Sequence, residues 1–154
     1  TNRPDKIDID LKRPGRLDYK IPFFFPQDQE TRAAVLQALI RKNKVLLEEG
    51  VDVEIISDDT EGYSAAELES VLLRAMRIAS EGDREELQES DLQQAATDVI
   101  PSRDTRMLEY MEMLAVFESS SRQMLPEKYR EKTTEEVHER LDVLRRQLGI
   151  FVRA

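Results

Sequence analysis

From Asp28 onward, apolar residues recur at the three- and four-residue spacing of amphipathic helices, with a polar cap before each run. The segments Ser64–Glu67 and Thr133–Glu136 both fit the capping-box pattern, in which two side chains bond each other's backbone amides. Caps are expected at Asp28, Ser64, Ser90, Asp104 and Thr133, with a short turn or helix over Val53–Asp59 and a C-cap at Gly149. This pattern predicts a mainly α-helical chain with about five helices.

The apolar stripe of each expected helix predicts which of its residues are buried. The predicted inward positions are Val35, Leu36, Leu39 and Ile40; Leu68, Val71, Leu72, Ala75 and Ala79; Leu92, Ala95, Ala96 and Val99; Leu108, Met111, Leu114 and Ala115; and Val137, Leu141, Leu144 and Leu148. The last stripe spans about two heptads, so we expect it to pack on the chain's own bundle rather than on a partner helix. His138 lies off that stripe between two glutamates and is expected to be solvated.

The first 26 residues differ from the rest of the chain. They hold four of the six prolines, Pro4, Pro14, Pro22 and Pro26, together with Gly15. Because proline restricts its own backbone and that of the preceding residue, this region is predicted to form turns and one short strand, Tyr19–Phe25. Phe23, Phe24 and Phe25 would then need cover, and we expect them to pack on the helices of residues 27–102 or on another copy of the chain.

Composition excludes several kinds of site. There is no cysteine among the 154 residues, so disulfides, thiolate nucleophiles and cysteine-built metal sites are ruled out, and a single histidine argues against a histidine-built metal site. No metal-ligand residues are therefore predicted. No apolar stretch approaches the roughly 18–20 residues that span a bilayer, which predicts a soluble, intracellular, cytoplasmic protein without a membrane segment.

The net charge of −9 is unevenly distributed. Residues 1–43 carry nine Lys and Arg against six Asp and Glu, residues 44–102 carry four against sixteen, and residues 103–154 carry ten against ten. An acidic middle repels phosphate backbones, so no nucleic-acid partner is expected. The basic N-terminal segment can still contact an anion locally.

Two arginines, Arg13 and Arg16, stand on either side of a Pro14-Gly15 turn. A stiff turn can aim both guanidinium groups at one anion, and their planar forks match phosphate oxygens. The alternative is that the two arginines form surface ion pairs with Asp10 and Asp18.

Residues 1–18 resemble the second region of homology of AAA ATPases, with Thr1-Asn-Arg-Pro-Asp5 followed by Leu11-Lys-Arg-Pro-Gly-Arg-Leu-Asp18. Thr60-Glu-Gly-Tyr-Ser-Ala-Ala-Glu-Leu68 is similar to the signature of the family's helical lid, and Ser90-Asp-Leu and Pro101-Ser102 match its last helix and exit. The resemblance covers about residues 1–102 and does not extend to 103–154.

The resemblance implies a mainly α fold: the helical lid bundle of an AAA ATPase, a short strand and turn remnant of its α/β nucleotide-binding core, and extra C-terminal helices. The implied domains are residues 1–26 for the core remnant, 27–102 for the lid and 103–154 for a helical extension.

The resemblance also implies roles for individual residues. Asn2 falls at the sensor-1 asparagine, and Arg13 and Arg16 match two arginine fingers that reach the ATP of a neighbouring subunit. Such fingers stabilise the charge on the transferred phosphoryl group and tie hydrolysis to assembly, commonly into a hexameric ring.

Four further residues fall where the family's lid contacts nucleotide. Val35 and Leu39 match positions beside the adenine, and Ala65 and Ala66 match a Gly-Ala pair near the phosphates. Leu39 stands where a histidine is common, and Ala65 replaces the glycine, so both depart from the family pattern. Ordinary core and capping roles are the alternative for all four.

The five glycines do not form a phosphate-binding G-x-x-x-x-G-K-[ST] loop, and the acidic end of Val53–Asp59 is out of order for a Walker B site. We therefore expect the sequence to be a C-terminal piece of an ATP-hydrolysing enzyme. ATP and magnesium would bind in the intact protein, whereas this piece is expected to bind neither and to be inactive alone.

The implied function is ATP-driven remodelling or unfolding of a protein client by a homo-oligomeric ring. A second hypothesis is a non-catalytic helical interaction module that keeps the lid fold. A third, an ATPase acting on DNA, is disfavoured by the acidic middle of the chain.

Overall fold

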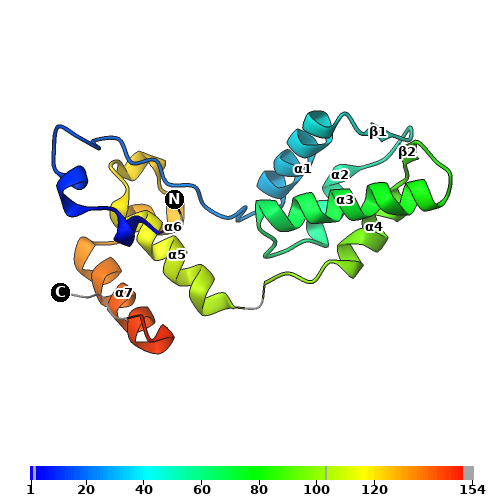
Figure 1. Ribbon diagram of the computed structural model, residues 1–154. Helices are drawn as coiled ribbons and strands as arrows, with labels where there is room; N and C mark the ends of the chain where they lie inside the picture. Colours follow the sequence, from blue (N-terminus) through cyan, green and yellow to red (C-terminus); the bar gives the residue numbers. More distant parts are fainter. Residues whose placement is uncertain (2, 103, 151–154) are drawn as a thin grey trace. The chain divides into compact units, whose positions relative to one another are not determined.

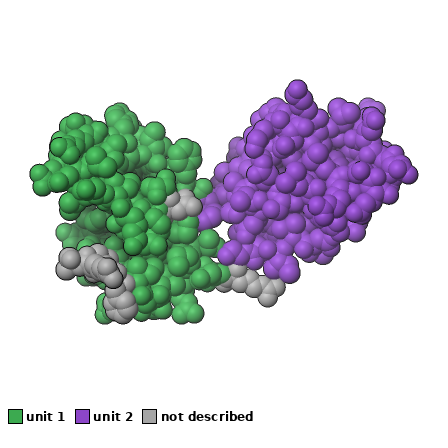
Figure 2. Space-filling view, viewed as in Figure 1, with its two compact units in different colours: residues 1–24, 103–154 green, residues 25–102 purple. Residues whose placement is uncertain are grey.

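The computed structural model describes residues 1, 3–102 and 104–150 and confirms a mainly helical chain. The chain forms two compact units, coloured separately in Figure 2. Residues 25–102 make the central unit, and residues 1–24 together with 103–154 make the terminal unit. The N-terminal segment and the C-terminal helices were predicted to be separate domains, but here they belong to one unit.

Four helices and one pair of very short strands build the central unit (Figure 1). The helices are α1 (Gln29–Asn43), α2 (Val53–Asp58), α3 (Ala65–Glu81) and α4 (Glu89–Asp98), and the strands are β1 (Leu46–Leu47) and β2 (Glu86–Leu87). The strands are parallel, and Leu47 lies opposite Leu87. Helix α3 is the longest and packs against α1 and α4.

Local capping sets most of the helix starts in this unit. The Asp28 side chain accepts a hydrogen bond from the Thr31 amide at 2.7 Å, and Ser64 and Glu67 form the predicted capping box. All five residues predicted to face inward on α3 are buried. On α1, Leu36 and Ile40 are buried, while Val35 and Leu39 are half-buried against the same core.

Helix α4 starts before the predicted cap. Gln88, not Ser90, is the N-cap, because the buried carboxylate of Asp91 accepts the Gln88 amide at 2.9 Å. The predicted core positions Leu92, Ala95 and Ala96 are buried.

The terminal unit is built on two helices, α5 (Thr105–Glu118) and α7 (Thr134–Leu148), which pack against each other (Figure 1). The short helix α6 (Glu127–Arg130) and a 3₁₀ turn, Arg122–Met124, connect them. Two further 3₁₀ turns, Pro4–Lys6 and Ile9–Lys12, form the N-terminal part. We refer to α5, α6 and α7 together as the C-terminal hairpin.

The face that α5 buries differs from the predicted one. Leu114 is buried as expected, but Leu108, Met111 and Ala115 are half-buried, and the other buried residues of α5 are Tyr110, Met113 and Val116. Helix α5 is apolar on most sides, so its pattern does not single out one face. The stripe on α7 is confirmed: Val137, Leu141 and Leu144 are buried in this unit's own core, Leu148 packs against it, and His138 is exposed.

The predicted strand Tyr19–Phe25 is wrong, since no strand is formed over these residues. The segment has two prolines, and its hydrogen bonds to the hairpin are confined to Lys20, which pairs with Ser120. Phe24 packs on the ring of Tyr129 with centroids 6.2 Å apart, whereas Phe23 is 91% exposed. Phe24 therefore packs on the C-terminal hairpin rather than on the helices of residues 27–102.

Candidate functional site

The Arg13–Arg16 segment forms a tight turn in the terminal unit. The Arg16 amide donates to the Arg13 carbonyl at 3.2 Å, and Gly15 has φ of +86°. Proline at the second position and a positive φ at the third are typical of a type II turn. A Cβ on Gly15 would meet nothing within 4 Å, so backbone conformation rather than space requires glycine here.

Both arginines of this turn reach the same residue, Asp10. Arg13 Nη2 lies 2.9 Å from Asp10 Oδ1, and Arg16 Nη1 donates to the Asp10 carbonyl at 3.1 Å. The Asp18 carboxylate accepts the Gly15 amide at 2.7 Å and so braces the turn. The alternative of surface ion pairs is therefore correct for Arg13 with Asp10. Asp18 instead accepts a hydrogen bond from the backbone of the turn.

The two guanidinium groups are brought together on an accessible surface. The Arg13 side chain is 71% exposed, and that of Asp10 is 57% exposed. An exposed ion pair of this kind is worth only about 0–1 kcal/mol, because water screens both charges. The Arg13–Asp10 pair therefore contributes little to the stability of the turn.

Asn2, the predicted sensor-1 position, lies outside the described residues. Its neighbour Arg3 forms two hydrogen bonds with the Asp5 carboxylate, at 2.9 and 2.6 Å. These bonds hold the pKa of the Asp5 carboxyl below its usual value. Arg3 thus forms its ion pair with Asp5 of the same motif.

The four predicted lid residues all belong to the central unit. Val35 and Leu39 lie one turn apart on α1 and pack on the core, so they have at least the core role weighed from the sequence. Ala65 and Ala66 are exposed in the first turn of α3. The lid residues belong to the central unit and the two arginines to the terminal unit.

Glu67 of the central unit makes a long-range hydrogen bond that the sequence does not predict. Its carboxylate accepts the Ser64 amide at 2.6 Å, as a capping box requires, and also the Ser102 amide at 2.5 Å. Burial favours a raised pKa for Glu67, but these hydrogen bonds outweigh burial, and its pKa lies below the usual value. The start of α3 is thereby tied to the end of the unit.

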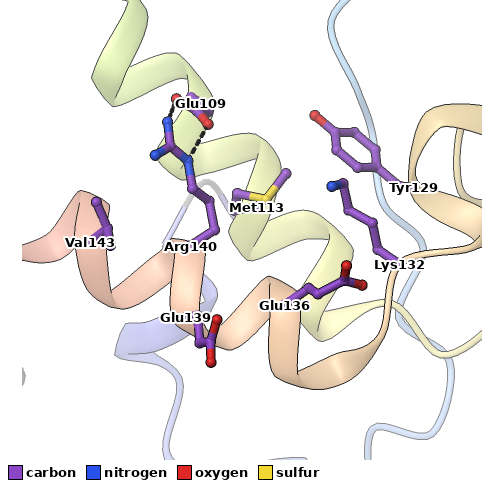
Figure 3. Close-up of a pocket in the computed structure, with 8 residues that line it drawn as sticks. All are labelled: Glu109, Met113, Tyr129, Lys132, Glu136, Glu139, Arg140 and Val143. Carbon is purple, nitrogen blue, oxygen red and sulfur yellow. Dashed lines mark hydrogen bonds and ion pairs between the residues drawn. The ribbon is translucent and has the colours of Figure 1, made fainter.

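An open hollow of about 440 Å³ lies on the C-terminal hairpin (Figure 3). In its wall, Arg140 of α7 forms two hydrogen bonds with Glu109 of α5, at 2.7 and 2.8 Å. Tyr129, also in the lining, donates to Glu112 at 2.7 Å, and burial raises the pKa of its hydroxyl. Charges of both signs line the hollow, and its ion pair joins the helices rather than marking a ligand.

Within the described part of the chain, no three acidic, histidine or cysteine side chains gather closely enough to hold a metal ion. The same residues include no helix with the length and apolar character needed to cross a bilayer.

Comparison with known proteins finds relatives among ATP-dependent enzymes. The chain is 40% identical over 100 residues to the ATP-dependent zinc metalloprotease FtsH of Lancefieldella parvula, a match covering 65% of this chain and 15% of that protein. It is 39% identical over 110 residues to FtsH of Staphylococcus haemolyticus, covering 70% and 15%. It is 37% identical over 99 residues to a probable 26S proteasome regulatory subunit 10B of Caenorhabditis elegans, covering 64% and 24%.

No family model matches the chain. The relatives and the motifs nevertheless agree on one class, the AAA ATPases. The chain belongs to the AAA ATPase family over the matched part, about 65–70% of its length. It spans about 15% of the length of the FtsH relatives.

Proposed function

We propose that this chain is the C-terminal part of an AAA ATPase and that Arg13 and Arg16 act as arginine fingers on ATP bound to a neighbouring subunit. The observation that carries the proposal is the convergence of both guanidinium groups on Asp10 from one rigid, exposed turn. Two forked cations held this way form a ready receptor for the oxygens of a triphosphate.

The chemistry of phosphoryl transfer explains why such a pair matters. Charge on the γ-phosphoryl oxygens must be stabilised in the transition state, and a finger supplied by another subunit is worth roughly 10³–10⁵ in kcat. ATP and magnesium would be held by parts of the intact protein that carry a phosphate-binding loop, a motif that this sequence does not contain. The chain alone is therefore expected to be inactive, and Asn2 would act at the γ-phosphate as a sensor-1 residue.

The central unit would serve as the lid over the nucleotide. Val35 and Leu39 stay half-buried, which leaves part of each side chain available to an adenine ring. Ala65 and Ala66 are exposed at the N-terminus of α3, where backbone amides favour negative charge. Their accessibility supports a nucleotide-facing role beside their structural ones.

In the intact protein, hydrolysis between the subunits of a homo-oligomeric ring, a hexamer in this proposal, would remodel or unfold a protein client. The names of the relatives support this, since they describe an ATP-dependent protease and a proteasome regulatory subunit. The rival function is a helical interaction module without catalysis, which would have no use for the two arginines.

The test is Arg16→Ala in the intact protein, with Arg106→Ala as a matched control on an exposed residue of the terminal unit. Removal of a finger should abolish hydrolysis and leave ATP binding largely intact, because the contact is made in the transition state. The control should keep the wild-type turnover. Unchanged hydrolysis in Arg16→Ala would refute the finger assignment and favour the interaction module.

A further inference from the structure

One carboxylate on the C-terminal hairpin holds two lysines of the N-terminal segment. Glu118, the last residue of α5, bonds Lys12 through Oε1 and Lys20 through Oε2, the second contact at 3.1 Å. Its side chain is 15% exposed, and those of the two lysines are 19% and 33% exposed. This cluster is thus much less accessible than the Arg13–Asp10 pair.

Backbone hydrogen bonds reinforce the same attachment. The Lys20 amide donates to Ser120 Oγ at 3.2 Å, and the Ser120 amide donates to the Lys20 carbonyl at 3.3 Å. Four residues further along, Phe24 stacks on Tyr129. The chain on the C-terminal side of the arginine turn is therefore fixed to the hairpin by charge, backbone and ring contacts.

The two lysines occupy the two ends of the loop that carries the arginines. Lys12 directly precedes Arg13, and Lys20 follows Arg16 by four residues. Because both ends are held on one carboxylate, loop 12–20 is closed at its base, and its tip has fewer conformations to explore. The arginines are at that tip and are both exposed, whereas the cluster of Lys12, Lys20 and Glu118 is partly buried.

We propose that Glu118 is a positioning residue for Arg13 and Arg16, so that the C-terminal hairpin sets the rate at which they support hydrolysis in the neighbouring subunit. This inference rests on the proposed function of the two arginines. Without the Glu118 charge, two ammonium groups would remain side by side at the base of the loop and repel each other. The base would open, and the tip would lose its alignment with the triphosphate.

The experiment is Glu118→Gln in the intact protein, with Glu131→Gln as a control at an exposed glutamate of the same unit. A misplacement of about 1 Å can cost roughly 10²-fold in rate, so kcat should fall between tenfold and a hundredfold. The KM for ATP should stay within twofold, since the arginines act in the transition state. The control should match wild type in both constants.

A charge exchange separates positioning from general damage. Lys12→Glu, Lys20→Glu and Glu118→Lys combined restore opposite charges at the base of the loop and should recover kcat to within fivefold of wild type. A fall of less than threefold in Glu118→Gln, or a rise in KM that matches the fall in kcat, overturns the inference.

Arg16→Ala, measured beside these variants, distinguishes the two proposals. If Arg16→Ala abolishes hydrolysis while Glu118→Gln does not slow it, the positioning role fails and the finger assignment stands. If Arg16→Ala has no effect, the finger assignment itself fails.

Discussion

Asp91→Asn is the substitution with the clearest consequence for the central unit. Asp91 is 3% exposed, and its carboxylate accepts three hydrogen bonds. Two come from Arg84, at 2.5 and 2.7 Å, and the third comes from the Gln88 amide at 2.9 Å. The residue thus joins the start of α4 to the chain that leaves α3.

The cost follows from what asparagine can accept. Asparagine has one carboxamide oxygen, which can accept hydrogen bonds at only one of the two positions that the Asp91 carboxylate oxygens occupy. Its NH₂ group then occupies the other position and faces an N–H donor there. Losing one charge-assisted hydrogen bond costs about 1.5–3 kcal/mol, and a second donor left facing NH₂ brings the total to about 2–4 kcal/mol. For a domain of this size, that loss lowers the unfolding midpoint by roughly 10–30 °C.

Hydrogen exchange, measured for individual peptides by mass spectrometry, can show whether the loss of stability lies in α3 and α4. The matched control is Asp98→Asn on the same helix, whose partner Arg74 lies 2.8 Å away at a more exposed site. Such a surface pair contributes about 0–1 kcal/mol, so the control should change protection little. Equal losses in the two variants would refute the argument from burial.

The same site gives a pH dependence. Hydrogen bonds from Arg84 lower the pKa of Asp91 from its ordinary 3.8, so the folded unit favours the ionised carboxylate. The stabilisation is complete above the ordinary pKa and is lost as pH falls through the lower, folded-state pKa. Unfolding measured from pH 7 downward should therefore show the wild type converging on Asp91→Asn in acid. A constant difference across that range would contradict the pKa assignment.

Two tyrosines test the hydrogen bonding of the two cores. Tyr63→Phe should lose about 1–3 kcal/mol from the central unit, seen as a lower midpoint in circular dichroism, because it leaves the carbonyls of Ala96 and Val99 without their donor. Tyr110→Phe should leave the stability of the terminal unit unchanged or raise it by up to about 1 kcal/mol, since the buried hydroxyl has no hydrogen-bond partner among the described residues. A clear loss in Tyr110→Phe would mean that this hydroxyl has a partner after all.

Features that depend on neighbours in the sequence are the ones that could be predicted. The caps at Asp28, Ser64 and Thr133 were readable because a cap and its amide are separated by three residues. The start of α4 was not readable in this way. There, Gln88 and Asp91 have the three-residue spacing of a capping box, but glutamine is not among the preferred N-cap residues, whereas the serine at Ser90 is.

Features that depend on packing between distant segments could not be predicted. The sequence of α5 is apolar on several sides, so contact with α7 decides that Tyr110 and Met113 turn inward. The short strands β1 and β2 have two residues each, too few for an alternating pattern to show. The turn that holds Arg13 and Arg16 was readable from proline and glycine, but its attachment to Glu118 spans about a hundred residues of sequence.

The contacts around the arginine turn differ in exposure between the base of the loop and its tip. At the base of the loop, Lys12 and Lys20 meet Glu118 where water has limited access, and such contacts hold better than exposed ones. At the tip, the pair of Arg13 with Asp10 is exposed and therefore weak. The proposed finger role requires this order, because Arg13 would have to exchange Asp10 for a phosphate while the base of the loop stays in place. If the strengths were reversed, the proposed role would require the loop to open at its base before the arginines could contact a neighbouring subunit.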